Sequence, residues 1–108
     1  MEYNIAKEFS RTPSARTEKE GKNPGESLRK IVAPKLRECI TKNEKFQIIL
    51  DGTAGYGTSF LEEVFGGLIR EEGLNYNDIK NTLIIVSDEE PDLIDEIWFD
   101  IEDANKNE

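Results

Sequence analysis

The stretch from Phe46 to Ile69 reads FQIILDGTAGYGTSFLEEVFGGLI, and it decides the fold. The apolar run from Phe46 to Leu50 predicts a buried strand, and the apolar spacing after Ser59 predicts a helix. Between them, the glycines that follow Asp51 predict a tight turn. Ser59 and Glu62 have the spacing of a capping box, so Ser59 is expected to cap the helix. Strand, glycine-rich turn and helix in this order are typical of α/β proteins, whose ligands gather where first-turn amides lack partners.

The residues before this stretch predict a short strand, a long loop and a helix. Alternating apolar residues from Tyr3 to Phe9 predict a weak first strand. Residues 10–24 have no apolar periodicity and several basic side chains, which indicates a loop of unusual length for a compact domain. A helix is expected to start at Pro24 and to bury the apolar positions up to Ile40. Pro34 lies inside this pattern and is expected to kink or split the helix.

The residues after it predict one more strand and one more helix. Residues 74–80 are expected to form a connector. The β-branched run from Asn81 to Ser87 predicts a strand, and its apolar character favours the centre of the sheet. A helix follows Pro91, and residues 105–108 are expected to fray. The buried face of that helix is expected to comprise Ile94, Ile97, Trp98 and Ile101.

The predicted order is therefore β-α-β-α-β-α. It indicates one α/β domain over residues 1–108, with a small parallel or mixed sheet of three to four strands packed with helices. Gly66 and Gly67 interrupt the second helix at ~1 kcal/mol each relative to alanine, which predicts a close approach to the sheet or to another helix. Gly73 is expected to end that helix.

Composition and charge exclude several classes of protein. The 108 residues contain no histidine, and Cys39 is the one cysteine, expected to be a buried structural thiol. There is no signal peptide and no apolar run of the ~18 residues that a membrane helix needs, so we expect a cytoplasmic protein. The net charge is −9, divided into +4 over residues 1–45 and −13 over residues 46–108. An acidic chain of this kind is not expected to bind nucleic acid.

The glycine turn resembles a nucleotide-binding loop but lacks its essential residue. Gly52 to Ser59 has the spacing of a Walker A motif between a strand and a helix. Thr58 stands where the motif needs a lysine to place positive charge on the phosphates. No catalytic triad, zinc cluster or other catalytic constellation is present in the sequence. We therefore expect a protein that is not an enzyme and that carries no cofactor and no metal.

The same residues resemble a known family. Asp51, the glycine turn and the run TSFLEEVFGGL at residues 58–68 look like the core motif of small bacterial STAS-like proteins of unknown function. The pattern from Phe9 through Arg16 and Gly25 to Arg29 is similar to the opening of that family. The resemblance implies a STAS-like domain, a distant relative of the anti-sigma-factor antagonists.

The resemblance also implies a function and a site. Such relatives bind a histidine-kinase-like ATPase and are switched by phosphorylation of a serine at the start of the helix after the central strand. In this register the serine is Ser59, with Thr58 beside it. Tyr56, Gly57 and Asp51 complete the expected partner surface, and an exposed Tyr56 would be a contact residue. The chain departs from the antagonist pattern because the aspartate before the phosphorylated serine and the glycine after it are both replaced.

A second class of function stays open at this point. The first-turn amides of the helix, together with Arg11 or Arg16, would suit a small-ligand sensor that holds a phosphate or nucleotide. A protein partner and a small anion would therefore compete for the same turn. Self-association also stays open.

Overall fold

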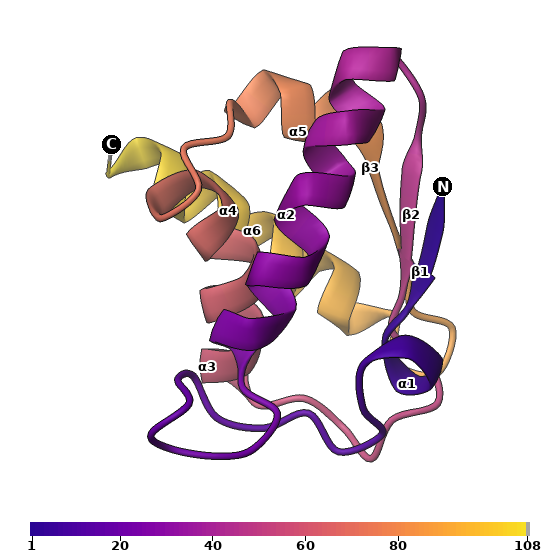
Figure 1. Ribbon diagram of the computed structural model, residues 1–108, viewed down its shortest axis with the longest axis vertical. Helices are drawn as coiled ribbons and strands as arrows, with labels where there is room; N and C mark the ends of the chain where they lie inside the picture. Colours follow the sequence, from indigo (N-terminus) through magenta and orange to yellow (C-terminus); the bar gives the residue numbers. More distant parts are fainter. Residues whose placement is uncertain (108) are drawn as a thin grey trace.

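The computed structural model describes residues 1–107 and shows a small parallel sheet with helices packed on one side of it (Figure 1). Strands β1 (Glu2–Asn4), β2 (Phe46–Ile49) and β3 (Leu83–Val86) lie in the order β1-β2-β3. Both pairs are parallel, and Tyr3, Ile48 and Ile85 are aligned across the three strands. The predicted α/β class and the small parallel sheet are confirmed.

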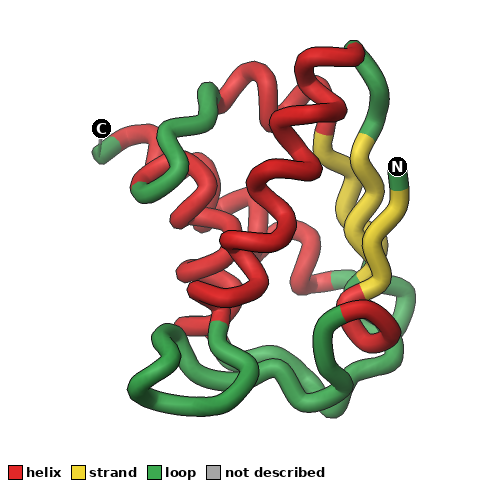
Figure 2. Tube along the Cα trace, in the orientation of Figure 1, coloured by secondary structure: helices red, strands yellow, loops and turns green. Residues whose placement is uncertain are grey.

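Helices and strands alternate along the chain, and two short helices, α1 and α5, are added to the predicted order. The segments α3, η1 and α4 form one continuous helical stretch, of which η1 is a π-helical turn. Figure 2 shows that the long loops gather at the end of the molecule where the strands finish. The helical elements are α1 (Ile5–Glu8), α2 (Gly25–Lys42), α3 (Thr58–Leu61), η1 (Glu62–Gly66), α4 (Gly67–Arg70), α5 (Tyr76–Thr82) and α6 (Asp92–Lys106).

The sheet has an inner and an outer face because side chains alternate along each strand. Phe46, Ile48 and Ile85 point into the helical layer and are buried. Gln47 and Ile84, aligned on the opposite face, are less buried, and Ile84 keeps 43% of its surface exposed. Strands that follow one another in chain order with right-handed crossovers place the crossover helices on the same face. The core therefore lies between the sheet and the helices, and it includes Cys39 as predicted.

Several element boundaries differ from the sequence predictions near the start of the chain. The first strand ends at Asn4, whose side-chain oxygen accepts a hydrogen bond from the Lys7 amide and caps α1, so Phe9 lies outside any strand. Pro34 does not split α2, which is continuous over Gly25–Lys42. This proline is exposed, so water can satisfy the carbonyl that its missing N–H leaves free.

Other differences concern the second half of the chain. The expected connector contains helix α5, because the side chain of Asn75 accepts hydrogen bonds from two amides and caps it. Strand β3 consequently begins at Leu83 and not at Asn81, and it lies at an edge of the sheet and not at its centre. Helix α6 continues through Lys106, which includes part of the stretch expected to fray, and Glu108 lies outside the described residues. Gly73 has a φ of +69° and ends the preceding helical stretch as predicted.

The capping prediction is wrong, because the observed N-cap lies two residues before Ser59. The helix begins at Thr58, with Gly57 as its N-cap, and no side chain caps it. Ser59 is therefore the second helical residue. Glu62 does not reach back to the start of the helix, because Arg16 and Arg70 bind its carboxylate.

The two glycines of η1 and α4 make room for neighbouring groups, as their position in the pattern predicts. A Cβ on Gly66 would meet the Glu62 carboxylate and would lie 3.4 Å from the Asp100 carbonyl oxygen of α6. A Cβ on Gly67 would lie 2.8 Å from Cδ of Arg29 on α2. The close approach is thus to other helical elements, and for Gly67 it is to a charged side chain.

We predict that Gly67→Ala destabilises the protein by ~1–3 kcal/mol through overpacking against Arg29. The sign is informative because alanine otherwise stabilises a helix by ~1 kcal/mol relative to glycine. Urea unfolding measures the change. In an Arg29→Ala background the same substitution should become neutral or stabilising. An unfolding free energy of Gly67→Ala equal to or above that of the parent would contradict the prediction.

Candidate functional site

The ends of β2 and β3 are joined by the carboxylate of Asp51. Its two oxygens accept the amides of Asp88 at 3.1 Å and Glu89 at 2.8 Å. In return, the Gly52 amide donates to the Glu89 carboxylate at 2.9 Å. Asp51 therefore holds the glycine turn against the turn that follows β3. The sequence placed Asp51 on the partner surface, and the structure shows that its carboxylate makes internal hydrogen bonds.

Tyr56 folds back onto the sheet and does not project from the tip of the turn. Its hydroxyl donates to the Leu50 carbonyl at 2.7 Å, and its ring centroid lies 5.9 Å from that of Phe60. The side chain is half-buried, and this burial raises the pKa of Tyr56 to about 12. Tyr56 thus stabilises the path of the turn from within.

Gly57, Thr58 and Ser59 lie together on the surface at the start of the helix. All three are exposed, and neither hydroxyl caps the helix. The following residue, Phe60, is buried and anchors the first turn in the core. Sequence reasoning and structure agree that two hydroxyl side chains stand at the N-terminus of the helical stretch that follows the central strand.

The surroundings of the turn do not favour an anion. A cavity of about 20 Å³, room for roughly one water molecule, lies beside the turn and is lined in part by Asp51, Glu89 and Glu90. Carboxylates in this position repel a phosphate. The backbone carbonyl of Arg11 accepts the Ala54 amide at 2.8 Å, which ties the long loop to the turn, while the Arg11 side chain is exposed.

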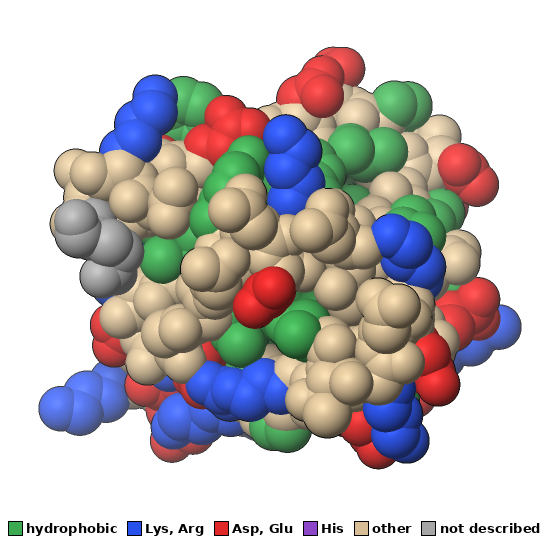
Figure 3. Space-filling view, turned by 90° about the horizontal axis from the view of Figure 1, so that it is seen from above, with side chains coloured by type: hydrophobic (Ala, Val, Ile, Leu, Met, Phe, Trp, Pro, Cys, Tyr) green, Lys and Arg blue, Asp and Glu red, His purple; other side chains and the backbone are tan. Residues whose placement is uncertain are grey.

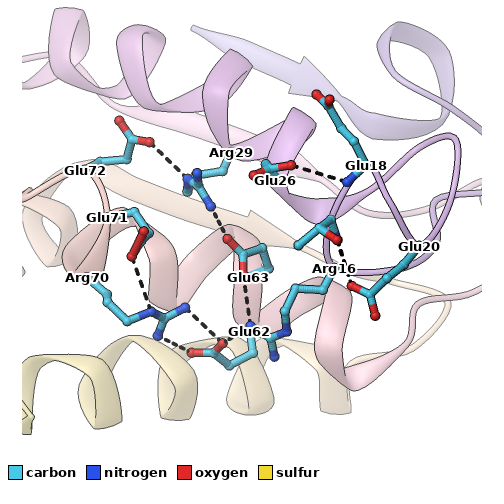
Figure 4. Close-up of polar contacts among 11 residues, drawn as sticks. Arg16, Glu18, Glu20, Glu26, Arg29, Glu62, Glu63, Arg70, Glu71 and Glu72 are labelled. Carbon is cyan, nitrogen blue, oxygen red and sulfur yellow. Dashed lines mark hydrogen bonds and ion pairs between the residues drawn. The ribbon is translucent and has the colours of Figure 1, made fainter.

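Arg16, the second anion-binding candidate, is already paired with carboxylates. Its guanidinium lies 2.7 Å from Glu62 and 3.0 Å from Glu63 (Figure 4). The hydrogen bond that Arg16 donates to Glu62 raises the pKa of Arg16, and burial opposes this shift only in part. The positive charge of Arg16 is therefore compensated inside the domain.

Arg16 belongs to an ion-pair network that sequence reasoning did not predict. Figure 4 shows Arg16, Arg29 and Arg70 converging on the glutamates of η1 from the long loop, α2 and α4. Arg29 forms ion pairs with Glu63 and with Glu72, which follows the helical stretch. The Nε atom of Arg29 lies 3.0 Å from the Glu72 carboxylate. The acidic members are Glu62, Glu63, Glu71 and Glu72.

The centre of this network is buried. Arg29 is 6% exposed and Glu63 is 9% exposed. Gly25 permits the approach, because a Cβ there would lie 2.7 Å from the Phe60 carbonyl oxygen and 3.0 Å from Cβ of Glu63. Burial alone would raise the pKa of Glu62, but hydrogen bonds from Arg70 and Arg16 lower it below its ordinary value. One signal in the sequence could have revealed the network: Arg29 lies three and four residues before buried positions of α2.

Comparison with known protein families identifies the class of the domain. A family model described as STAS-like domain of unknown function (DUF4325) matches residues 25–93. The chain belongs to this family, and its mixed α/β fold is consistent with a STAS-like domain. No curated protein and no solved structure matches the chain.

The residues that carry the family resemblance coincide with the ion-pair network. Arg16, Gly25 and Arg29 from the opening pattern contact or approach the two glutamates of the core motif. The motif therefore describes how the long loop, α2 and η1 pack together. The hydroxyl pair at residues 58–59 is the part of the core motif that stays on the surface.

Two further observations concern the rest of the surface. Among residues 1–107, no helix is both long and apolar enough to cross a membrane. Figure 3 looks onto the end of the molecule where the strands begin, opposite the glycine turn. Its hydrophobic side chains form small separate groups between charged ones, so this view shows no broad apolar patch.

We predict that Asp100→Asn stabilises the protein at pH 7.5 but not near pH 4. Burial raises the pKa of Asp100 to about 6, and Glu62, Glu96 and Asp103 add to the rise. Because the folded-state pKa lies above the unfolded value of ~3.9, the carboxyl group destabilises the fold progressively as pH rises through this window.

Thermal unfolding at the two pH values measures the effect. Asp103→Asn, on an exposed position of the same helix, is the matched control and should give a smaller gain. An equal gain from Asp100→Asn at both pH values would show that the Asp100 charge does not oppose folding.

Proposed function

We propose that this domain is a non-catalytic regulatory module that binds a protein partner through the start of its long helical stretch. The proposed surface comprises the exposed part of Gly52–Ser59 and the first turn of α3. A histidine-kinase-like ATPase is the proposed partner, by analogy with the anti-sigma-factor antagonists that the family resembles. Phosphorylation of Ser59, or of Thr58 beside it, is the proposed switch.

One observation carries this proposal. The hydroxyl groups of Thr58 and Ser59 are exposed and do not cap the helix. The backbone is anchored on both sides of them. The turn before them is held by Tyr56, and Phe60 after them is buried. A kinase can therefore reach the hydroxyls without unfolding the domain, and a partner meets them in a defined position.

A phosphate at the start of the helix would meet one favourable and one unfavourable electrostatic contribution. A phosphate adds about −1.5 to −2 charge, which a helix N-terminus favours by ~0.3–1 kcal/mol. The carboxylates of Glu62 and Glu63 are compensated by arginines, which reduces their repulsion of a phosphate. The partner surface then determines whether phosphorylation strengthens or weakens binding. By analogy with the antagonists, we expect weaker binding.

The proposal favours a protein partner over the anion-sensing class. Carboxylates line the small cavity beside the turn, and Arg16 is engaged in ion pairs. Neither observation suits a site for free phosphate.

The test is to capture partners on the purified chain, identify any ATPase by mass spectrometry, and titrate it by calorimetry. We expect Ser59→Asp to weaken binding at least tenfold, or ~1.4 kcal/mol, while Ser59→Ala binds like the parent. Thr41→Asp on an exposed position of α2 is the matched control and should have no effect.

Incubation of the partner with ATP and the chain then tests the switch directly. Phosphate on Ser59 or Thr58, located by peptide mass spectrometry, is the expected result. Equal affinity of the parent, Ser59→Asp and Thr41→Asp, with no phosphate on either hydroxyl, would refute both the surface and the switch.

A further inference from the structure

The two edges of the sheet differ in how they are protected. At the β1 edge, the outward amide of Asn4 donates to the Glu8 carboxylate at 2.8 Å. At the other edge, β3 contains no charged residue, proline or bulge, and no strand of residues 1–107 pairs with its outer side. Charged side chains, prolines and bulges are the usual protection of an edge strand against pairing with another chain.

The ladder shows which backbone groups of β3 face outward. The Leu50 amide donates to the Val86 carbonyl at 2.8 Å, so Val86 bonds toward β2. Because bonding direction alternates along a strand, Ile85 points its amide and carbonyl away from β2. No hydrogen bond among the described residues takes up these two groups. Ile85 keeps 7% of its surface exposed, whereas Ile48 beside it on the central strand keeps 1%.

We propose that β3 pairs antiparallel with β3 of a second copy of this chain, which joins the two sheets into one of six strands. With Ile85 opposite Ile85 of the second copy, the two residues exchange both backbone hydrogen bonds. The Ser87 amide and the Leu83 carbonyl, which point the same way, form the next pair of bonds. This proposal goes beyond the proposed function and does not depend on it.

Side chains on the outer face fit the same register. Ile84 lies directly opposite Val86 of the second copy, at the close spacing of a non-hydrogen-bonded pair. The pairing covers Ile84, which is 43% exposed in the single chain. An apolar edge strand with unpaired backbone groups is a ready template for pairing with another chain.

Charge complementarity favours a second copy in this orientation. The residues that follow β3 are Asp88, Glu89 and Glu90, all exposed. Two lysines lie at the start of β3: Lys80 is exposed there, and the Lys45 ammonium group donates to the Asn81 carbonyl. The antiparallel arrangement brings the acidic turn after β3 of one copy to the start of β3 of the other, where Lys80 lies near the end of α5. In this orientation the three acidic residues of one copy face the lysines of the other, and not a second acidic turn.

Sedimentation velocity on the full chain, at protein concentrations up to roughly 1 mM, tests the pairing. We expect a reversible dimer whose dissociation constant rises at least tenfold in Ile84→Lys. Ile31→Lys is the matched control, because Ile31 is 37% exposed but lies on α2, and it should change the constant less than twofold. Lys80→Glu should weaken the dimer, and Glu90→Lys in the same chain should restore it.

Disulfide trapping tests the register. A chain with Ile84→Cys mixed with a mass-tagged chain with Val86→Cys should cross-link under mild oxidation faster than either chain with itself. The native Cys39 is buried and does not compete. A chain that stays monomeric over the whole concentration range, a dimer unaffected by Ile84→Lys, or preferential 84–84 cross-links would overturn the proposal.

Discussion

The buried ion pair between Arg29 and Glu63 is the constraint on which the rest of the structure depends. It brings together α2 and η1, and Arg16 extends it to the long loop. A buried pair adds little net stability compared with apolar residues of the same size, but the loss of one partner leaves an uncompensated charge in the interior. The backbones must therefore stay where both charges meet. Gly25 and Gly67 are the consequence, because a Cβ at either position would occupy the space that this packing needs.

This arrangement separates the residues that stabilise the fold from the surfaces that are available for binding another protein. The arginines and glutamates of the ion-pair network compensate one another inside the fold, and Asp51 and Tyr56 hold the glycine turn from within. The hydroxyl pair at residues 58–59 stays exposed, and no strand of residues 1–107 pairs with the outer edge of β3. The two surfaces are built from different elements. A partner on the first and a second copy on the other are therefore independent proposals that can succeed or fail separately.

Local patterns predicted those features that depend on neighbouring residues. The strand, turn and helix of Phe46–Ile69, the buried Cys39 and the glycine that ends the helical stretch follow from periodicity and backbone freedom. The edge position of β3 could not be predicted, because an apolar strand reads the same at the centre and at an edge. The ion pairs were also missed, since Arg29 and Glu63 lie 34 residues apart and only the fold brings them together. The half-buried position of Tyr56 could not be predicted for the same reason, because its hydrogen-bond partner is the backbone carbonyl of Leu50, just after β2.

A double-mutant cycle on Arg29 and Glu63 tests the central claim most directly. Urea unfolding of Arg29→Met and Glu63→Leu should give losses of ~3–5 kcal/mol for each single variant, and the double variant should lose much less than their sum. The exposed pair Lys42 and Glu38 is the matched control, with an expected coupling of ~0.3–0.5 kcal/mol. Single losses below ~1 kcal/mol, or strictly additive losses in the double variant, would contradict the account, because the domain would then hold its shape without this pair.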